Sequence, residues 1–209
     1  MSAARLNVNP TRMELQRLRA RLGTARRGHK LLKDKTDEMT RRFMTVARRN
    51  KELREEVEAE LGEAMKGFVL ARALTPPSVV VQTLMMPSRT VSLNARTGIL
   101  MGVRVPAIGI EQSEAADLFP YSFISVTSEM DSSVQTLNNL LLKLIKLAQT
   151  EKTTNVLADE IEKSKRRVNA LEYVLIPQLE ETVKYIRFRL EENERGALVR
   201  LMKVKEKTR

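Results

Sequence analysis

The sequence feature that most constrains the fold is an uninterrupted heptad pattern in the first third of the chain. From Leu15 to Val57 the candidate core positions alternate steps of three and four residues, which is typical of a coiled-coil helix. Continued to Ala71 at ~1.5 Å per residue, such a helix spans roughly 85 Å and has no core of its own. A second long helix must therefore lie against it. The seam positions are Leu15, Leu18, Leu22, Ala25, His29, Leu32, Thr36, Met39, Phe43, Val46, Asn50, Leu53 and Val57.

A second apolar run near the other end of the chain supplies the partner. Its spacing averages about 3.6 residues per step, the period of a straight helix, so we expect an antiparallel pair with only a gentle left-handed twist. Three successive steps of four between Leu171 and Val183 predict a register adjustment there, and Pro177 is predicted to kink the helix without ending it. The run comprises Leu157, Ile161, Ser164, Val168, Leu171, Leu175, Leu179, Val183, Ile186, Leu190, Asn193, Ala197, Leu201 and Val204.

The segment between the two runs differs in composition. Five of the seven prolines fall between residues 76 and 120, so the first helix is expected to end near Thr75. Alternating residues predict a β-hairpin at about 89–105, with strands 89–95 and 99–105 joined by residues 96–98. Helix is expected to resume between residues 121 and 131, with Thr127 or Ser128 as cap.

These patterns predict an all-α dominated fold. It is a long antiparallel two-helix coiled coil formed by the N- and C-terminal helices, with a small β-hairpin and irregular segment in the middle. The predicted divisions are 1–74 for the N-terminal helix, 75–125 for the middle segment and 126–209 for the C-terminal helix.

Composition argues against several classes of protein. The absence of cysteine excludes disulfides and favours the cytoplasm, and the most apolar run, residues 140–148, is too short to span a membrane. Residues 23–30 nearly match a phosphate-binding loop, but they lie inside the heptad seam with no strand before them. His29 is the only histidine. We therefore expect a non-enzymatic chain with no catalytic residues, no metal and no cofactor.

The net charge of +11 is unevenly placed. Residues 1–49 contain 14 basic and 4 acidic side chains, residues 184–209 contain 9 and 4, and the remainder is near −4. In an antiparallel pair both basic ends lie together, which predicts one positive tip and a mildly acidic body. Such charges either solvate the coiled coil or mark a negatively charged or dipolar partner. Two classes remain open: a basic nucleic-acid-binding protein and a mechanical or scaffolding subunit, which the expected rod favours.

From Leu137 to Ala148 the apolar residues surround most of the helix, and one facing helix cannot bury them all. Either the middle segment packs on the second face, or that face docks a separate subunit. The candidate docking residues are Leu137, Leu140, Leu141, Leu144, Ile145 and Leu147.

Several stretches resemble a known family. Residues 9–15 (NPTRMEL), 28–35 (GHKLLKDK), 166–177 (RRVNALEYVLIP), 191–195 (EENER) and 200–205 (RLMKVK) resemble the two terminal helices of the D subunit of V-type and A-type rotary ATPases. The middle segment resembles the family only over residues 99–106. A long C-terminal tail like that of the eukaryotic proteins is missing, which is typical of the prokaryotic form.

The resemblance implies a central-stalk rotor shaft of a V-type ATPase or ATP synthase, which couples ATP hydrolysis or synthesis to rotation of the ion-translocating membrane ring. The implied partners are the catalytic A and B subunits, the funnel-shaped subunit that caps the ring, and the small F subunit. The chain itself would be peripheral on the cytoplasmic side and would bind neither nucleotide nor nucleic acid. The residues that the resemblance places in the bore of the A/B hexamer are Arg5, Arg12, Arg17, Arg19, Arg21, Arg26, Arg195, Arg200, Lys203 and Lys205.

Overall fold

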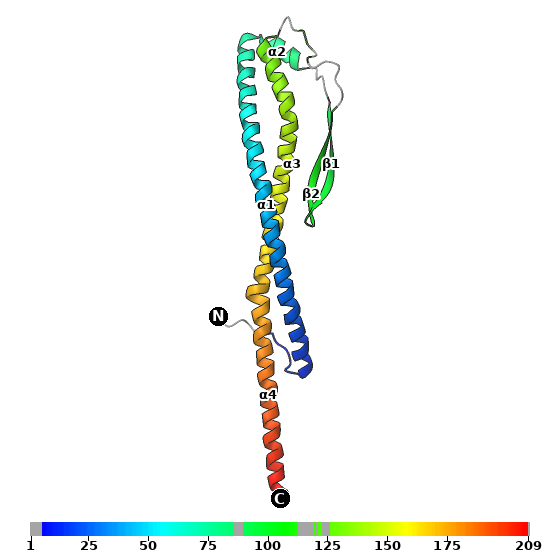
Figure 1. Ribbon diagram of the computed structural model, residues 1–209, viewed down its shortest axis with the longest axis vertical. Helices are drawn as coiled ribbons and strands as arrows, with labels where there is room; N and C mark the ends of the chain where they lie inside the picture. Colours follow the sequence, from blue (N-terminus) through cyan, green and yellow to red (C-terminus); the bar gives the residue numbers. More distant parts are fainter. Residues whose placement is uncertain (1–5, 86–89, 113–118, 120, 123–125, 209) are drawn as a thin grey trace. The chain divides into compact units, whose positions relative to one another are not determined.

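The computed structural model describes residues 6–85, 90–112, 119, 121–122 and 126–208. The chain is mostly helical with a central two-stranded hairpin, which confirms the predicted fold class (Figure 1). It divides into two compact units, unit 1 (Met1–Glu38 and Ile161–Arg209) and unit 2 (Met39–Glu160). The elements are α1 (Arg12–Leu74), α2 (Pro77–Leu84), β1 (Val91–Leu100), β2 (Val103–Gln112), α3 (Ser128–Ala170), the π-helical turn η1 (Leu171–Leu175) and α4 (Ile176–Lys207).

In unit 1 the first part of α1 packs antiparallel against α4. Arg12 pairs with Glu194 and Arg26 with Glu180, both at 2.6 Å. Residue numbers on α4 therefore decrease as those on α1 increase, which shows that the two helices are antiparallel. Leu18, Ala25, Leu179 and Ile186 form the buried cluster between the two helices. No predicted seam position from Leu15 to Val57 is exposed, which confirms the heptad pattern as the buried face of α1.

The extended segment before α1 is held against the same helices. The Leu6 N–H donates to Thr182 Oγ1 (3.1 Å), and the Leu6 and Val8 side chains pack on the buried cluster. Helix α1 then starts with a capping interaction, because Thr11 Oγ1 accepts from the N–H of Glu14 at 3.2 Å.

The π-helical turn η1 lies where the sequence predicted a register adjustment. It begins at Leu171, the first residue of the three successive steps of four, and it is followed by Pro177 in the first turn of α4. A π turn carries one extra residue, so it realigns the apolar positions of α4 with the heptad seam of α1. The helical conformation continues through Pro177, as predicted.

In unit 2 the second part of α1 packs antiparallel against α3. The Lys143 ammonium of α3 donates to Glu60 of α1, which raises the pKa of Lys143 above its usual value. Asn50 Oδ1 accepts from Thr150 Oγ1 at 3.2 Å, so this polar seam residue bonds the facing helix. Thr127 immediately precedes α3, but its buried hydroxyl has no hydrogen-bond partner among the described residues and does not cap the helix.

The short helix α2 was not predicted from the sequence. Pro77 occupies its first turn, where a missing N–H costs nothing, and no side chain caps it. Val80 of α2 packs with Ala71 of α1 and Met130 of α3 in a second buried cluster. The helix therefore closes the end of unit 2 at which α1 stops and α3 starts.

The predicted position of the hairpin turn, at residues 96–98, is wrong. Strand β1 pairs with β2 without interruption from Val91↔Gln112 to Leu100↔Val103, and the turn is formed by Met101 and Gly102. Both turn residues have positive φ, 54° and 82°, as a two-residue turn of type I′ requires. This register also places Pro106, which has no N–H, opposite Thr97 in a pair that exchanges no hydrogen bond.

Met101 is a non-glycine residue in the left-handed region, so its backbone is strained. We expect Met101→Asn to stabilise the hairpin by about 0.5–1 kcal/mol, since asparagine followed by glycine is preferred in this turn. Hydrogen exchange of the hairpin amides that point into the ladder should slow about two- to fivefold. Met101→Leu keeps the strain and should leave the exchange rates unchanged. Equal slowing in both variants would contradict the backbone explanation.

Candidate interaction surfaces

The described part of the chain contains no group of three or more His, Asp or Glu side chains able to hold a metal ion. None of its helices is both long enough and apolar enough to span a bilayer. The candidate functional features are therefore surfaces, and they differ between the two units.

The charge of the chain is concentrated in unit 1. Unit 1 contains 23 Lys and Arg against 12 Asp and Glu, whereas unit 2 contains 14 of each. The entire net charge of +11 therefore lies in unit 1, and unit 2 is electrically balanced. A surface with this bias attracts acidic or dipolar partners.

All but one of the ten predicted bore residues are described, and these nine lie exposed in unit 1, while Arg5 lies outside the described residues. Arg12 and Arg26 form the two interhelical ion pairs, and Arg17 pairs with Glu14 at 3.3 Å. Arg195 and Arg200 donate to backbone carbonyls of their own helix.

Among the described residues, none forms an ion pair with Arg19, Arg21, Lys203 or Lys205. These four cations are available to a partner.

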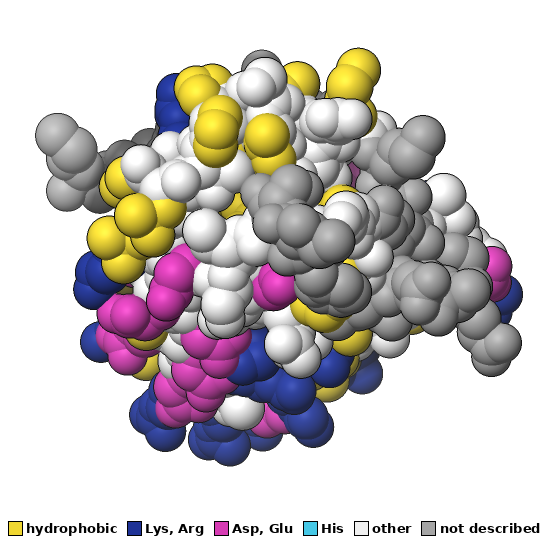
Figure 2. Space-filling model, turned by 90° about the horizontal axis from the view of Figure 1, so that it is seen from above, with side chains coloured by type: hydrophobic (Ala, Val, Ile, Leu, Met, Phe, Trp, Pro, Cys, Tyr) yellow, Lys and Arg dark blue, Asp and Glu magenta, His cyan; other side chains and the backbone are white. Residues whose placement is uncertain are grey.

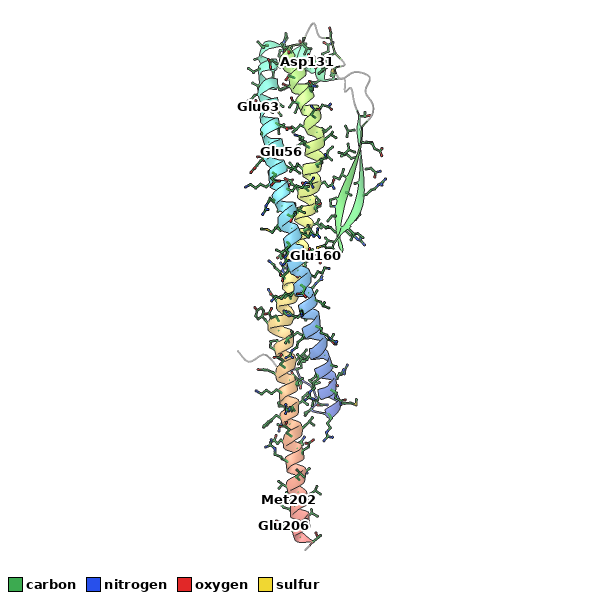
Figure 3. The ribbon with its side chains drawn as sticks, viewed as in Figure 1. Glu56, Glu63, Asp131, Glu160, Met202 and Glu206 are labelled. Atoms are coloured by element: carbon green, nitrogen blue, oxygen red, sulfur yellow. The ribbon has the colours of Figure 1, made fainter. Side chains whose placement is uncertain are left out.

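The C-terminal end of α4 has no helix beside it within unit 1. From Glu191 to Thr208 every residue is exposed except Gly196, which is half-buried. Figure 3 labels Met202 and Glu206 on this stretch, beyond the first turn of α1. Leu201 is 66% and Met202 64% exposed. The predicted seam is confirmed as far as Leu190, but its last positions, Asn193, Ala197, Leu201 and Val204, face solvent.

The six predicted docking residues of α3 are mostly covered within unit 2. Leu140 is fully buried, four are half-buried, and only Leu144 is exposed, at 37%. The hairpin lies beside α3 in this unit (Figure 1), where the Ile108 N–H donates to Gln149 Oε1 at 3.4 Å. This contact favours the alternative in which the middle segment packs on the second face of α3.

A larger exposed apolar surface lies elsewhere in unit 2, and the sequence interpretation missed it. We call it the α1–α2 patch; its exposed members are Met65, Val69, Leu70, Leu74, Val81, Leu84 and Met85. An open apolar groove of about 510 Å³ lies along it, lined by Gly62, Met65, Lys66, Val69 and Leu70. Figure 2 looks onto the end of unit 2 at which α2 lies and shows hydrophobic side chains at its surface. The signal was present in residues 61–74 (LGEAMKGFVLARAL), which are apolar on both faces of the helix.

The π-helical turn carries a polar contact and an exposed aromatic side chain. Glu172 Oε2 lies 3.2 Å from Nε2 of His29, the polar seam residue of α1. Tyr173 and Val174, in the same turn, are exposed. The contact between His29 and Glu172 joins α1 to η1. It lies at the point in unit 1 where the π-helical turn changes the register between α1 and the facing helix.

Sequence comparison decides what kind of chain carries these surfaces. The family model that describes the ATP synthase D subunit matches residues 14–206. The chain belongs to the family of ATP synthase D subunits. It is 54% identical over 201 residues to the V-type ATP synthase D subunit of Thermoanaerobacter sp. (strain X514), covering 96% of each chain. It is 51% identical over 205 residues to the protein of the same name in Clostridium novyi, covering 97% of this chain and 95% of the relative.

The match confirms the resemblance found in the terminal helices and extends it through the hairpin. Members of this family are central-stalk rotor subunits of V-type ATP synthases and are not catalytic. The alternatives of a nucleic-acid-binding or scaffolding protein are therefore not needed to explain the charge of unit 1.

Proposed function

We propose that this chain is the rotor of a V-type ATPase or ATP synthase and that the bare end of α4 enters the bore of a hexamer of alternating catalytic A and B subunits. The observation that carries this proposal is the exposure of residues 191–208, where apolar and basic side chains share one unpartnered helix end. An exposed helix end of this kind gains most from a partner that surrounds it, since no single face of it is apolar.

The basic side chains give the proposed contact its electrostatic part. Arg5, Arg12, Arg17, Arg19, Arg21, Arg26, Arg195, Arg200, Lys203 and Lys205 belong to the unit that holds the whole net charge. Positive side chains on a rotor are attracted to acidic or carbonyl groups on a bore over a longer range than apolar side chains are. Long-range attraction of this type permits the rotor to turn between successive positions.

The proposed mechanism follows from symmetry. Two antiparallel helices cannot present the same face to three equivalent catalytic interfaces, so each interface takes a different conformation and nucleotide affinity. Turning the rotor exchanges the three states. ATP hydrolysis in the hexamer thus drives rotation of the membrane ion-translocating ring, and ion flow through the ring drives ATP synthesis, because the coupling is reciprocal.

Unit 2 is proposed to hold the other partners. The small F subunit docks on α3 through the exposed Leu144 and the half-buried Leu137, Leu141, Ile145 and Leu147, while Leu140 supports them from the interior of unit 2. The funnel-shaped subunit that caps the membrane ring takes the α1–α2 patch. In this arrangement the chain is peripheral on the cytoplasmic side of the membrane, is not inserted, and binds no nucleotide, cofactor or nucleic acid itself.

Affinity purification tests this assembly directly. The tagged chain is purified from its own cells after nuclease treatment at two salt concentrations, and the co-purifying proteins are identified by mass spectrometry. Recovery of two large nucleotide-binding proteins and a small partner at both salt concentrations is expected. Recovery that depends on nucleic acid and disappears at the higher salt would overturn the proposal.

The charge of the α4 end gives a sharper prediction. We expect the combined variant Arg200→Gln, Lys203→Gln and Lys205→Gln to weaken binding of the chain to the A/B hexamer roughly tenfold or more at low salt, with a smaller loss at high salt. Binding is measured by titrating purified hexamer with labelled chain. The matched control is Arg41→Gln, Arg48→Gln and Arg49→Gln, which removes the same charge from unit 2. Equal losses in both variants would show a response to net charge alone.

A further inference from the structure

The β-hairpin of unit 2 has two outer edges, and they are protected to different degrees. On β2, the Ile108 N–H points away from β1 and bonds Gln149 of α3, and Pro106 has no N–H to offer. On β1, none of the described residues outside β2 hydrogen-bonds to the backbone of residues 91–100. Strand β1 therefore carries the open edge of the hairpin.

The pairing register fixes which backbone groups this edge presents. Ile108 donates outward, so Ala95↔Ile108 is a pair without mutual hydrogen bonds, as is Thr97↔Pro106. The pattern alternates along an antiparallel ladder, so the N–H and C=O groups of Leu93, Ala95, Thr97 and Ile99 point outward from β1. Those of Asn94, Arg96 and Gly98 point into the ladder.

Strand edges in soluble proteins are usually blocked by a bulge, a proline, a lysine or a covering segment. The register of β1 is continuous over ten pairs, so the strand has no bulge, and it contains neither proline nor lysine. Leu93 is 57% and Ile99 77% exposed, and both side chains lie on the same face because the residues are six apart. The edge is therefore open and is apolar on one face.

We propose that the open edge of β1 binds an extended segment of another subunit of the V-type ATP synthase by β-strand addition. The inference rests on the proposed function and adds a binding mode to it. Backbone hydrogen bonds to residues 93, 95, 97 and 99 supply the affinity, and the side chains of β1 supply the selectivity.

The side chains of β1 define the chemistry of the segment that fits. Leu93 and Ile99 require apolar residues opposite them on one face. Arg96 lies midway between them on the other face, is exposed, and forms no ion pair with a described residue. The complementary strand therefore carries two apolar residues six positions apart with an acidic residue midway. This pattern selects an amphipathic extended segment with an acidic side chain.

Hydrogen exchange at single-residue resolution tests the proposal. In the isolated chain the amides of Ala95, Thr97 and Ile99 should exchange fast, while those of Arg96 and Gly98, which bond β2, exchange slowly. In the purified complex the three outward amides should slow by at least roughly tenfold. Unchanged fast exchange of these amides in an intact complex overturns the inference and leaves the proposed function standing.

Two other outcomes also decide the matter. If the outward amides are already slow in the isolated chain and the chain is a dimer at that concentration, a second copy occupies the edge and the inference is wrong. If the chain recovers no complex at all, the proposed function fails, and the inference fails with it.

A proline substitution separates the edge from the hairpin itself. Thr97→Pro removes one outward N–H and leaves the ladder bonds intact, as Pro106 does on the opposite strand. We expect the inward amides of Arg96 and Gly98 to stay slow, while complex formation weakens about tenfold and Ala95 and Ile99 lose their protection. Thr97→Ala keeps the N–H and should behave as the unchanged chain. Complex formation by Thr97→Pro with protected outward amides would overturn the proposal.

Discussion

Replacing Leu179 by alanine is expected to lower the free energy of unfolding of unit 1 by about 3 kcal/mol. Leu179 is fully buried in the cluster that joins α4 to Leu18 and Ala25 of α1. Removing the side chain loses its transfer free energy and leaves a cavity in the cluster that α1 and α4 share. Urea unfolding followed by far-UV circular dichroism measures the loss.

Leu201→Ala is the matched control, because it makes the same chemical change on the same helix. Leu201 is 66% exposed, so its truncation should change the free energy of unfolding by less than about 0.5 kcal/mol. The same variant is expected to weaken binding to the A/B hexamer, since the exposed end of α4 is the proposed contact. A large stability loss in Leu201→Ala would show that the end of α4 is buried within the free chain.

The contrast between these two leucines also shows what the sequence could predict. Both occupy positions of the second apolar run, and the period alone does not separate them. Burial requires a facing helix, and α1 begins at Arg12, opposite the level of Glu194. The seam therefore ends near Leu190, and the same pattern beyond it belongs to an external surface. Periodic apolar residues predict a buried stripe without identifying the chain that buries it.

The hairpin was predicted correctly in kind and incorrectly in register. Gly98 and Gly102 are both acceptable turn residues, and local sequence does not choose between them. The choice depends on pairing over the full ladder, which places Pro106 at a position that donates no hydrogen bond. This information lies in residues four and more positions away from the turn.

The sequence interpretation singled out α3 and missed the exposed apolar residues of α1 and α2 for a similar reason. Residues 137–148 and 61–74 both surround their helices with apolar side chains. The hairpin contacts α3 at Gln149, and the second face of α3 is largely covered. The α1–α2 patch is left exposed. Which of the two apolar stretches stays exposed to solvent depends on where the middle segment packs. Helix periodicity contains no information on that tertiary contact.

The second large effect concerns the close approach of α1 and α3 in unit 2. A Cβ atom added at Gly67 would lie 2.6 Å from Ser133 Oγ, which is itself buried and donates to the carbonyl of Glu129. We expect Gly67→Ala to lower the free energy of unfolding of unit 2 by about 1.5 kcal/mol, because the strain of overpacking exceeds the gain in helix propensity. Urea unfolding measures the change.

Two further variants isolate the steric cause. Gly62→Ala lies in the same helix with nothing within 4 Å of the added Cβ, so it should stabilise the chain by about 1 kcal/mol through helix propensity alone. Ser133→Ala removes the oxygen that the Gly67→Ala methyl group meets, so the double variant should recover the loss, with a coupling free energy of about 2 kcal/mol. Additive effects of the two substitutions would mean that the helices separate instead of clashing, and that Gly67 does not set their distance.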